Sequence, residues 1–222
     1  MELKHEIPAG HEEFFLKDIM NSSLLFREAY PYRMINSIYF DTFSLSGFEE
    51  SVSGNQIRQK HRLRWYETAS EISPVTYEIK HKNSHISWKH LNKTNHLINY
   101  DAQSWDELFV KKIKIQELQF PSLTNLKPVS LVTYKRLYYV SWDGRIRLTI
   151  DNHISFRNQR LLNSPNFKNF SYHTSSSIVE MKFAEEDFDL AMNLQKNINI
   201  KPKRFSKYCE SISSSNFSKR KS

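Results

Sequence analysis

The sequence is poor in the residues that build disulfides, phosphate loops and membrane spans. Its 222 residues include one cysteine, Cys209, and only 4 glycines and 7 prolines. A single cysteine excludes an internal disulfide and fits a reducing compartment. The few glycines form neither a GxxxxGK[ST] nor a GxGxxG motif, so the sequence offers no Gly-rich phosphate loop. No apolar run reaches the roughly 18 residues of a membrane span, and the first residues lack the pattern of a signal peptide.

Acidic residues are fewer than basic ones, 24 against 32, which gives a net charge of +8. This imbalance favours polyanionic partners: nucleic acid, phosphorylated small molecules, polyphosphate or an acidic membrane surface. The hydrophobic fraction of 39%, with 15 Phe, 11 Tyr and 4 Trp, can build a sizeable core and favours strands. We predict one soluble, cytoplasmic domain at residues 1–212, followed by a disordered basic tail at 213–222.

The stretch Ile57–Glu67 carries a row of positive charge. Read as a strand, it places Arg58, Lys60, Arg62 and Arg64 on one face and a largely apolar row on the other. Neighbouring cations on that face would lie roughly 6–7 Å apart and repel one another. The row therefore predicts an anion that lies along the strand. The alternative is a solvated edge strand whose charges prevent pairing with other sheets.

The same alternation of charged and apolar faces recurs in other predicted strands. The charged positions are Glu2 and Lys4, then Glu78, Lys80 and Lys82, then Arg145 and Arg147, and finally Glu180 and Lys182. Helices predicted at 11–21, 102–120 and 184–200 can cover the apolar faces. A closed barrel would gather the charged faces inside, whereas an open sheet would present them to nucleic acid. A lumen lined by cations is unfavourable when empty and becomes favourable when an anion fills it.

Seven short segments occur in the order seen in VTC domains, and the chain resembles that family. They are Asn36–Thr42, Lys60–Tyr66, Glu78–Lys80, Tyr134–Arg136, Arg145–Asp151, Glu180–Phe183 and Phe205–Tyr208. VTC domains are the catalytic domains of vacuolar transporter chaperone polyphosphate polymerases, in the triphosphate tunnel metalloenzyme (CYTH-like) superfamily. The resemblance covers about residues 2–210. It implies an α+β fold in which an eight-stranded antiparallel β-barrel, the triphosphate tunnel, is flanked by helices.

The resemblance also implies roles for single residues. The residues expected to grip the triphosphate and to act in catalysis are Arg62, Arg64, Arg136, Arg147 and Lys207. Further phosphate contacts are expected from Lys4, Lys60, Lys80, Lys89, Lys182 and Ser206. Glu180 matches the carboxylate that holds a divalent metal, Mn²⁺ or Mg²⁺. The alternative for Glu180 is a salt bridge to a tunnel lysine, and one of Lys80 and Lys82 is expected on a solvated face.

Three functions are compatible with this resemblance. The first is a polymerase that uses ATP and extends polyphosphate, the second is a hydrolase of tripolyphosphate, nucleotides or RNA 5′ ends, and the third is a binder of polyphosphate or RNA without catalysis. Hydrolases of the superfamily carry Glu-x-Glu-x-Lys, whereas this chain has only Glu2-Leu3-Lys4. The expected shortage of acids favours the polymerase, and an open tunnel or an incomplete metal site would favour the binder. DNA is not an expected partner, and a membrane-protein partner is left open.

The remaining reactive side chains show no catalytic pattern. The 9 histidines have no metal-ligand spacing, so each is expected at the surface or in a hydrogen bond. Cys209 is expected to pack rather than to act as a nucleophile. Asp41 is expected to be structural, bonding a turn or a tunnel arginine.

Overall fold

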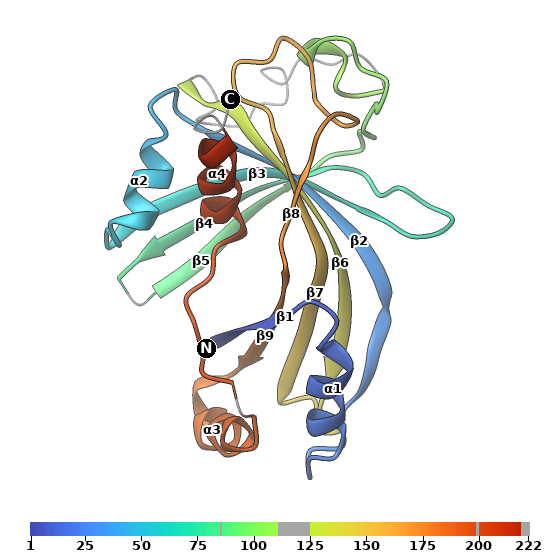
Figure 1. Ribbon diagram of the computed structural model, residues 1–222, viewed down its shortest axis with the longest axis vertical. Helices are drawn as coiled ribbons and strands as arrows, with labels where there is room; N and C mark the ends of the chain where they lie inside the picture. Colours follow the sequence, from blue (N-terminus) through green and yellow to red (C-terminus); the bar gives the residue numbers. More distant parts are fainter. Residues whose placement is uncertain (85, 111–124, 199, 219–222) are drawn as a thin grey trace. The chain divides into compact units, whose positions relative to one another are not determined.

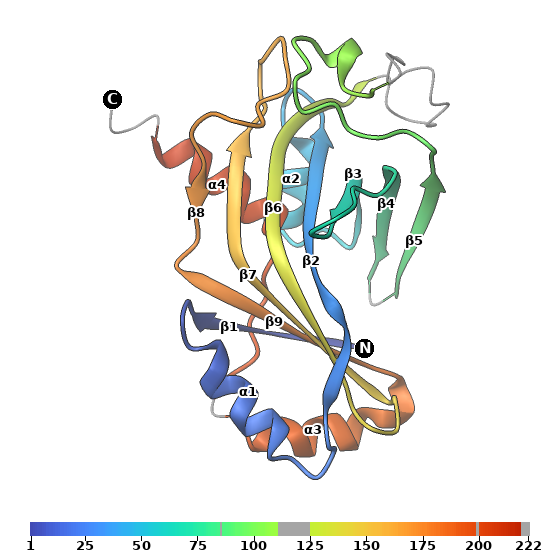
Figure 2. The same ribbon diagram turned by 90° about the vertical axis from the view of Figure 1, so that its right-hand side faces the viewer.

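The computed structural model describes residues 1–84, 86–110, 125–198 and 200–218. It is an α+β protein in which one large sheet is accompanied by four helices (Figures 1 and 2). The strands are β1 (Glu2–Pro8), β2 (Arg27–Asp41), β3 (Ile57–Glu67), β4 (Thr76–Asn83), β5 (Ile86–Lys93), β6 (Lys127–Val140), β7 (Ile146–Asn158), β8 (Tyr172–His173) and β9 (Ser176–Phe183). The helices are α1 (Glu12–Met20), α2 (Ser46–Val52), α3 (Phe188–Lys196) and α4 (Lys207–Ser218).

The strands form an open sheet, with β1 and β5 at the two ends of the strand order. Hydrogen-bonded neighbours follow the order β1-β9-β7-β6-β2-β3-β4-β5, and β8 pairs with β7. The pairs β1–β9, β7–β9, β3–β4 and β4–β5 are antiparallel, as predicted. The prediction of an eight-stranded closed barrel is corrected to a nine-stranded sheet whose order begins at β1 and ends at β5. The alternation of residues specifies which face of each strand is charged. Because this pattern is the same in an open and in a closed sheet, it does not distinguish the two.

The chain divides into two compact units that share the long strands β2, β6 and β7. Unit 1 comprises Met1–Met34, Tyr134–Ile154 and His173–Phe205, and unit 2 comprises Ile35–Thr133, Ser155–Tyr172 and Ser206–Ser222. Each unit has its own hydrophobic core. The single domain at 1–212 stays a prediction.

The core of unit 1 lies between the strands β1, β9 and β7 and the helices α1 and α3. His5, Val179 and Ile150 are partners across neighbouring strands, and all three are buried. Phe15 and Ile19 from α1 and Leu194 from α3 pack into the same apolar cluster. The helices thus cover the apolar face, as the alternation predicted, and the charged residues of these strands lie on the opposite face.

The core of unit 2 follows the same rule on strands β3 and β4. Leu63, Trp65 and Tyr77 are fully buried, Ile79 is buried beside them, and Phe109 belongs to the same core cluster. The charged row of β3 lies on the other face, which is the face approached by α4. Helix α4 contacts α2, and α2 contacts β3 (Figure 1).

Asp143 and Gly144 form the turn that joins β6 to β7, where Gly144 has a φ of 78° and the Ser141 amide donates to the Ile146 carbonyl across the hairpin. The helix predicted at 102–120 is wrong where the structure describes it: only Trp105–Glu107 forms a 3₁₀ turn, and 111–124 lie outside the described residues. Its apolar residues Leu108 and Phe109 instead fill the core of unit 2.

The tail prediction is also corrected in part. Helix α4 continues to Ser218, into the segment 213–222 that was expected to be disordered, and 219–222 lie outside the described residues. The helix is held by buried residues in its first turns, Tyr208 and Ile212. Among the described residues, no helix is both long and apolar enough to cross a membrane.

Candidate phosphate-binding site

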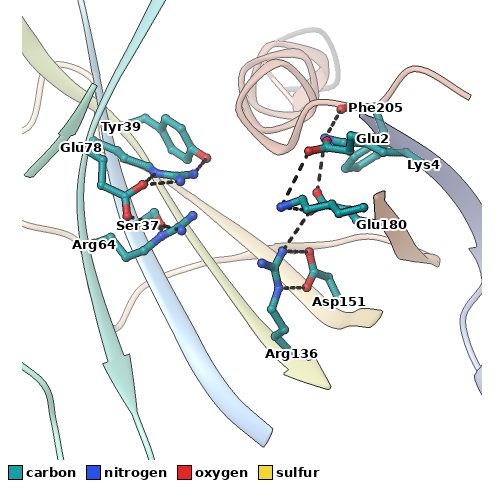
Figure 3. A network of polar contacts seen from close by, with 12 residues as sticks. Glu2, Lys4, Ser37, Tyr39, Arg64, Glu78, Arg136, Asp151, Glu180 and Phe205 are labelled. Carbon is teal, nitrogen blue, oxygen red and sulfur yellow. Dashed lines mark hydrogen bonds and ion pairs between the residues drawn. The ribbon is translucent and has the colours of Figure 1, made fainter. Parts of the chain in front are cut away.

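Two arginines and a glutamate form the centre of a polar network in unit 2. Arg62 and Glu78 are direct partners in the β3–β4 ladder, and the Arg62 guanidinium donates to Glu78 Oε2 from Nε at 2.8 Å and from Nη2 at 2.5 Å. Arg64 Nη1 lies 3.5 Å from Glu78 Oε1, and its Nε donates to Ser37 Oγ at 3.4 Å (Figure 3). One buried carboxylate therefore orients two of the four arginines that the resemblance assigned to the triphosphate.

The electrostatics of this network are dominated by positive charge. Burial by itself raises the pKa of Glu78, but the charges of Arg62, Arg64 and Lys89 outweigh it and hold the pKa below its ordinary value. Burial likewise raises the pKa of Tyr39, and Arg62, Arg64 and Lys207 overcome that effect. Lys89 thus acts on Glu78 and Lys207 on Tyr39, alongside the arginine pair.

Lysines continue the positive surface across the sheet. In the ladder, Lys60 is the direct partner of Lys80, and Lys80 is the direct partner of Lys89. Lys60 Nζ donates to Ser206 Oγ at 2.8 Å, just before the start of α4. We call this set the basic cluster; it consists of Lys60, Arg62, Arg64, Lys80, Lys89, Lys207 and one carboxylate, Glu78. Lys80 is partly exposed, as is Lys82, so the expectation that one of them is solvated remains a prediction.

A second network lies in unit 1 and mixes the two charge signs. Lys4 and Glu180 are direct partners in the β1–β9 ladder, as are Glu2 and Lys182. Lys4 Nζ lies 3.1 Å from Glu2 and 3.3 Å from Glu180, and Lys182 Nζ lies 3.7 and 3.6 Å from the same two carboxylates. Burial lowers the pKa of Lys4, yet Glu180 and Glu2 overcome this effect and raise it. Two ammonium groups are therefore shared by two carboxylates.

Arg136 extends this network from strand β6. Its guanidinium makes a two-pronged contact with buried Asp151, at 2.5 Å from Nε and 2.6 Å from Nη2, and Nη2 lies 3.6 Å from Glu180 (Figure 3). We call this set the mixed cluster; it consists of Glu2, Lys4, Arg136, Asp151, Glu180 and Lys182. Arg147 is exposed and is the direct partner of Lys182 in the β7–β9 ladder.

The structure brings together most of the predicted residues, but in two groups, and it adds residues that the sequence reading did not assign. Glu180 was expected as the metal carboxylate, and it makes ion pairs with Lys4, Arg136 and Lys182, the kind of role given as its alternative. The unassigned residues that complete the networks are Glu2, Ser37, Tyr39, Glu78 and Asp151. The same period of two that identified the cations places Glu2, Glu78 and Asp151 on their faces, so this signal was present in the sequence.

Asp41 has the structural role that the sequence suggested. Its buried carboxylate accepts hydrogen bonds from the backbone amides of Thr42 at 2.7 Å, Gly47 at 2.9 Å and Phe48 at 2.9 Å, which holds the start of α2. It also accepts one from the Tyr208 hydroxyl of α4. The Tyr208 ring in turn stacks on Tyr39, with centroids 5.1 Å apart. Asp41 thus connects α2 and α4 to Tyr39, the residue that contacts Arg62.

The carboxylates of the mixed cluster suit a hard divalent cation. Glu2 and Glu180 already share cationic groups, and Mg²⁺ is commonly bound by one or two carboxylates together with substrate phosphates. In the part of the chain that the structure describes, no group of three or more His, Cys, Asp or Glu side chains is arranged to hold a metal. A metal here would depend on phosphate oxygens for its remaining ligands.

Comparisons with known proteins agree with this geometry. The model of the VTC domain family matches residues 14–216. No curated protein matches the chain. Among solved structures, PH1819 from Pyrococcus horikoshii OT3 aligns with a TM-score of 0.53 and 15% identity, covering 97% of this chain and 98% of that one. A candidate adenylate cyclase from Vibrio parahaemolyticus aligns with a TM-score of 0.50 and 11% identity, covering 96% and 97%. At these identities the likenesses show a shared fold.

Proposed function

Because the chain belongs to the VTC domain family, we propose that it is a polyphosphate polymerase, which transfers the γ-phosphate of ATP to a growing polyphosphate chain. The observation that carries this proposal is the pair of arginines, Arg62 and Arg64, oriented by the single carboxylate of Glu78. Phosphoryl transfer requires positioning and charge neutralisation more than covalent chemistry from the protein. The basic cluster, with several cations near one carboxylate, is suited to position phosphates and to neutralise their charge.

The arginine pair is suited to bind phosphate oxygens. Arg62 donates hydrogen bonds from Nε and Nη2 to Glu78 and from Nη1 to the Tyr39 hydroxyl. Its guanidinium plane is therefore held in one orientation. Arg64 uses Nε and Nη1, and its Nη2 donates to no group in the described residues, which leaves donors for a ligand. Planar arginine donors bind phosphate oxygens in pairs, and the lysines of the basic cluster add point charges. In this proposal Lys207 and Ser206 contact phosphate at the start of α4.

The mixed cluster supplies the acidic residues of the proposed reaction. Glu180, with Glu2, would hold Mn²⁺ or Mg²⁺ in place of part of the lysine charge. A bound divalent ion neutralises charge on the phosphates and draws electron density from the transferring group. Lys4, Arg136 and Lys182 orient these carboxylates through their ion pairs. Arg147, exposed beside Lys182, adds a phosphate contact.

A triphosphate hydrolase of the same fold is the second candidate, and one observation favours it. The shortage of acids expected from the sequence favours the polymerase, yet Glu2, Asp151 and Glu78 join Glu180 in the two networks. A hydrolase needs an acidic group to orient water, and these carboxylates remove that objection. The open strand order, in turn, favours the third candidate, a binder without catalysis.

One experiment separates the three functions. The purified chain is incubated with ATP and Mn²⁺ or Mg²⁺, and long-chain polyphosphate is separated from orthophosphate and from ADP. The polymerase produces chain-incorporated phosphate with release of ADP. Free orthophosphate without a chain would establish the hydrolase instead. Neither product, together with salt-dependent binding of polyphosphate, would establish the binder. A cytoplasmic location and the absence of a DNA partner remain predictions.

A further inference from the structure

A cavity of about 260 Å³ opens in unit 2 at one end of the charged face of β3. Its walls come from α2, from the end of β2, from the first half of β3 and from the start of α4. The side chains that matter for its chemistry are Tyr39, Ser46, Glu50, Arg58, Lys60 and Tyr208. Its volume is close to the lower end of the range for small-molecule sites, roughly 300–1,000 Å³.

The cavity carries opposite charges on its walls. Glu50, on α2, is partly buried, and its carboxylate has no hydrogen bond or ion pair with any described residue. Arg58 and Lys60 bring positive charge from β3. An inorganic phosphate chain has no donor to offer a carboxylate and would be repelled by it. A ligand with hydroxyl donors at one end and phosphates at the other satisfies both walls.

The cavity and the arginine pair follow one another along β3. Lys60, Arg62 and Arg64 follow one another on the same face of the strand, at steps of roughly 6–7 Å. The cavity adjoins Lys60, and the Glu78 network lies beyond it at Arg62 and Arg64. A nucleotide laid along the strand would therefore place its phosphates on the arginines and its nucleoside in the cavity.

The aromatic residues of the cavity suit such a nucleoside. Tyr39 and Tyr208 stack on each other with an interplanar angle of 24°, and both residues line the cavity. Rings of this kind give apolar contact to a sugar or a base. The Tyr208 hydroxyl is bound to Asp41, so the ring is held in place by the contact that also anchors α2.

We infer that this cavity is the nucleoside subsite of the proposed enzyme, and that Glu50 accepts hydrogen bonds from the ribose hydroxyls of a ribonucleoside triphosphate. This inference rests on the proposed function and extends it, because it assigns recognition of the donor's ribose to one cavity and one residue. An ionised glutamate is only an acceptor, and it discriminates against a sugar without hydroxyl donors. The γ-phosphate then lies at the far end of the ligand, toward Arg62 and Arg64.

The test compares three ligands by calorimetry on the full chain at fixed salt and metal: ATP, 2′,3′-dideoxy-ATP and tripolyphosphate. The wild type is expected to bind ATP about tenfold more tightly than dideoxy-ATP, the scale of a hydrogen bond to a charged group. Glu50→Gln should weaken ATP about tenfold and leave dideoxy-ATP and tripolyphosphate within about twofold. Glu50→Asp, which shortens the reach of the carboxylate, should give an intermediate loss for ATP alone.

Glu49→Gln is the matched control, because Glu49 is the exposed neighbour on α2 and does not line the cavity. It should leave all three affinities unchanged. The inference would be overturned if the wild type bound ATP and dideoxy-ATP equally. It would also be overturned if Glu50→Gln weakened ATP and tripolyphosphate by the same factor. In either case, tripolyphosphate binding by the wild type would still support the proposed function. A wild type that binds neither ATP nor tripolyphosphate would overturn both.

Discussion

The two polar networks differ in how their charges are balanced. The basic cluster of unit 2 sets six cations against one carboxylate, Glu78, whereas the mixed cluster of unit 1 sets three cations against three carboxylates. A region in which cations outnumber carboxylates gains free energy when an anion binds. A region in which the two signs balance needs no anion to offset its charge. In the proposed function, unit 2 therefore binds phosphate and unit 1 positions acidic groups.

The largest effect expected from this comparison is on stability, at the one acid of the basic cluster. Glu78→Gln removes a buried charge that holds two arginines, and breaking a buried pair costs about 3–5 kcal/mol of the free energy of unfolding. Because the folded-state pKa of Glu78 lies below 4.5, its stabilisation is complete above about pH 4.5 and is lost as the pH falls through that folded-state pKa. Urea unfolding of both proteins between pH 3 and 7 measures this difference.

The response of Glu78→Gln to tripolyphosphate also distinguishes the basic cluster from the mixed cluster. Tripolyphosphate can replace the lost carboxylate, so it should raise the melting temperature of Glu78→Gln more than that of the wild type. A variant as stable as the wild type at pH 7, with an unchanged response to tripolyphosphate, would show that Glu78 does not organise the basic cluster.

The second effect concerns catalysis in the mixed cluster. Glu180→Gln keeps the shape of the side chain and removes the charge proposed to hold the metal. If this role is right, turnover of ATP should fall by about 100-fold or more, the scale for loss of one electrostatic group in an active site. Binding of ATP measured without metal should survive. The readouts are product formation in the polymerase assay and calorimetry in the presence of a chelator.

The control for Glu180 is Glu6→Gln on the same strand face as Lys4. Glu6 pairs at 2.5 Å with the exposed Lys203, outside the mixed cluster, and its substitution should leave turnover unchanged. Full turnover in Glu180→Gln would instead assign Glu180 to a structural ion pair with Lys4, Arg136 and Lys182.

The third and smallest effect is on anion affinity in the basic cluster. Arg64→Ala removes one guanidinium that is proposed to bind phosphate. It should weaken the free energy of tripolyphosphate binding by about 1.5–3 kcal/mol, the scale for hydrogen bonds to charged groups. Lys135→Ala is the matched loss of one positive charge, because Lys135 lies on the opposite face of β6 from Arg136 and contacts the Tyr32 ring. Calorimetry at fixed salt should show a loss for Arg64→Ala alone. Equal losses in the two variants would mean that net charge, not a specific grip, attracts the anion.

Much of the candidate site was predictable because it follows strand periodicity. The period of two placed Arg62 and Arg64 on one face and Leu63 on the other, and the structure confirms this separation. The helix predicted at 102–120 failed because apolar spacing does not distinguish a helix from an irregular segment buried by its neighbours, as Phe109 is. Glu50 lies in a short helix with no periodic signal, so only the structure could relate it to a cavity.

The sequence by itself determined the alternation of charged and apolar faces, the excess of positive charge and the order of motifs that identifies the family. These properties depend on neighbouring positions along the chain. The tertiary structure decided which charges meet: Glu78 with Arg62 and Arg64, and Glu180 with Lys4, Arg136 and Lys182. It also decided that the strand order stays open between β1 and β5. Such pairings depend on the register and neighbours of strands far apart in sequence, which local periodicity does not specify.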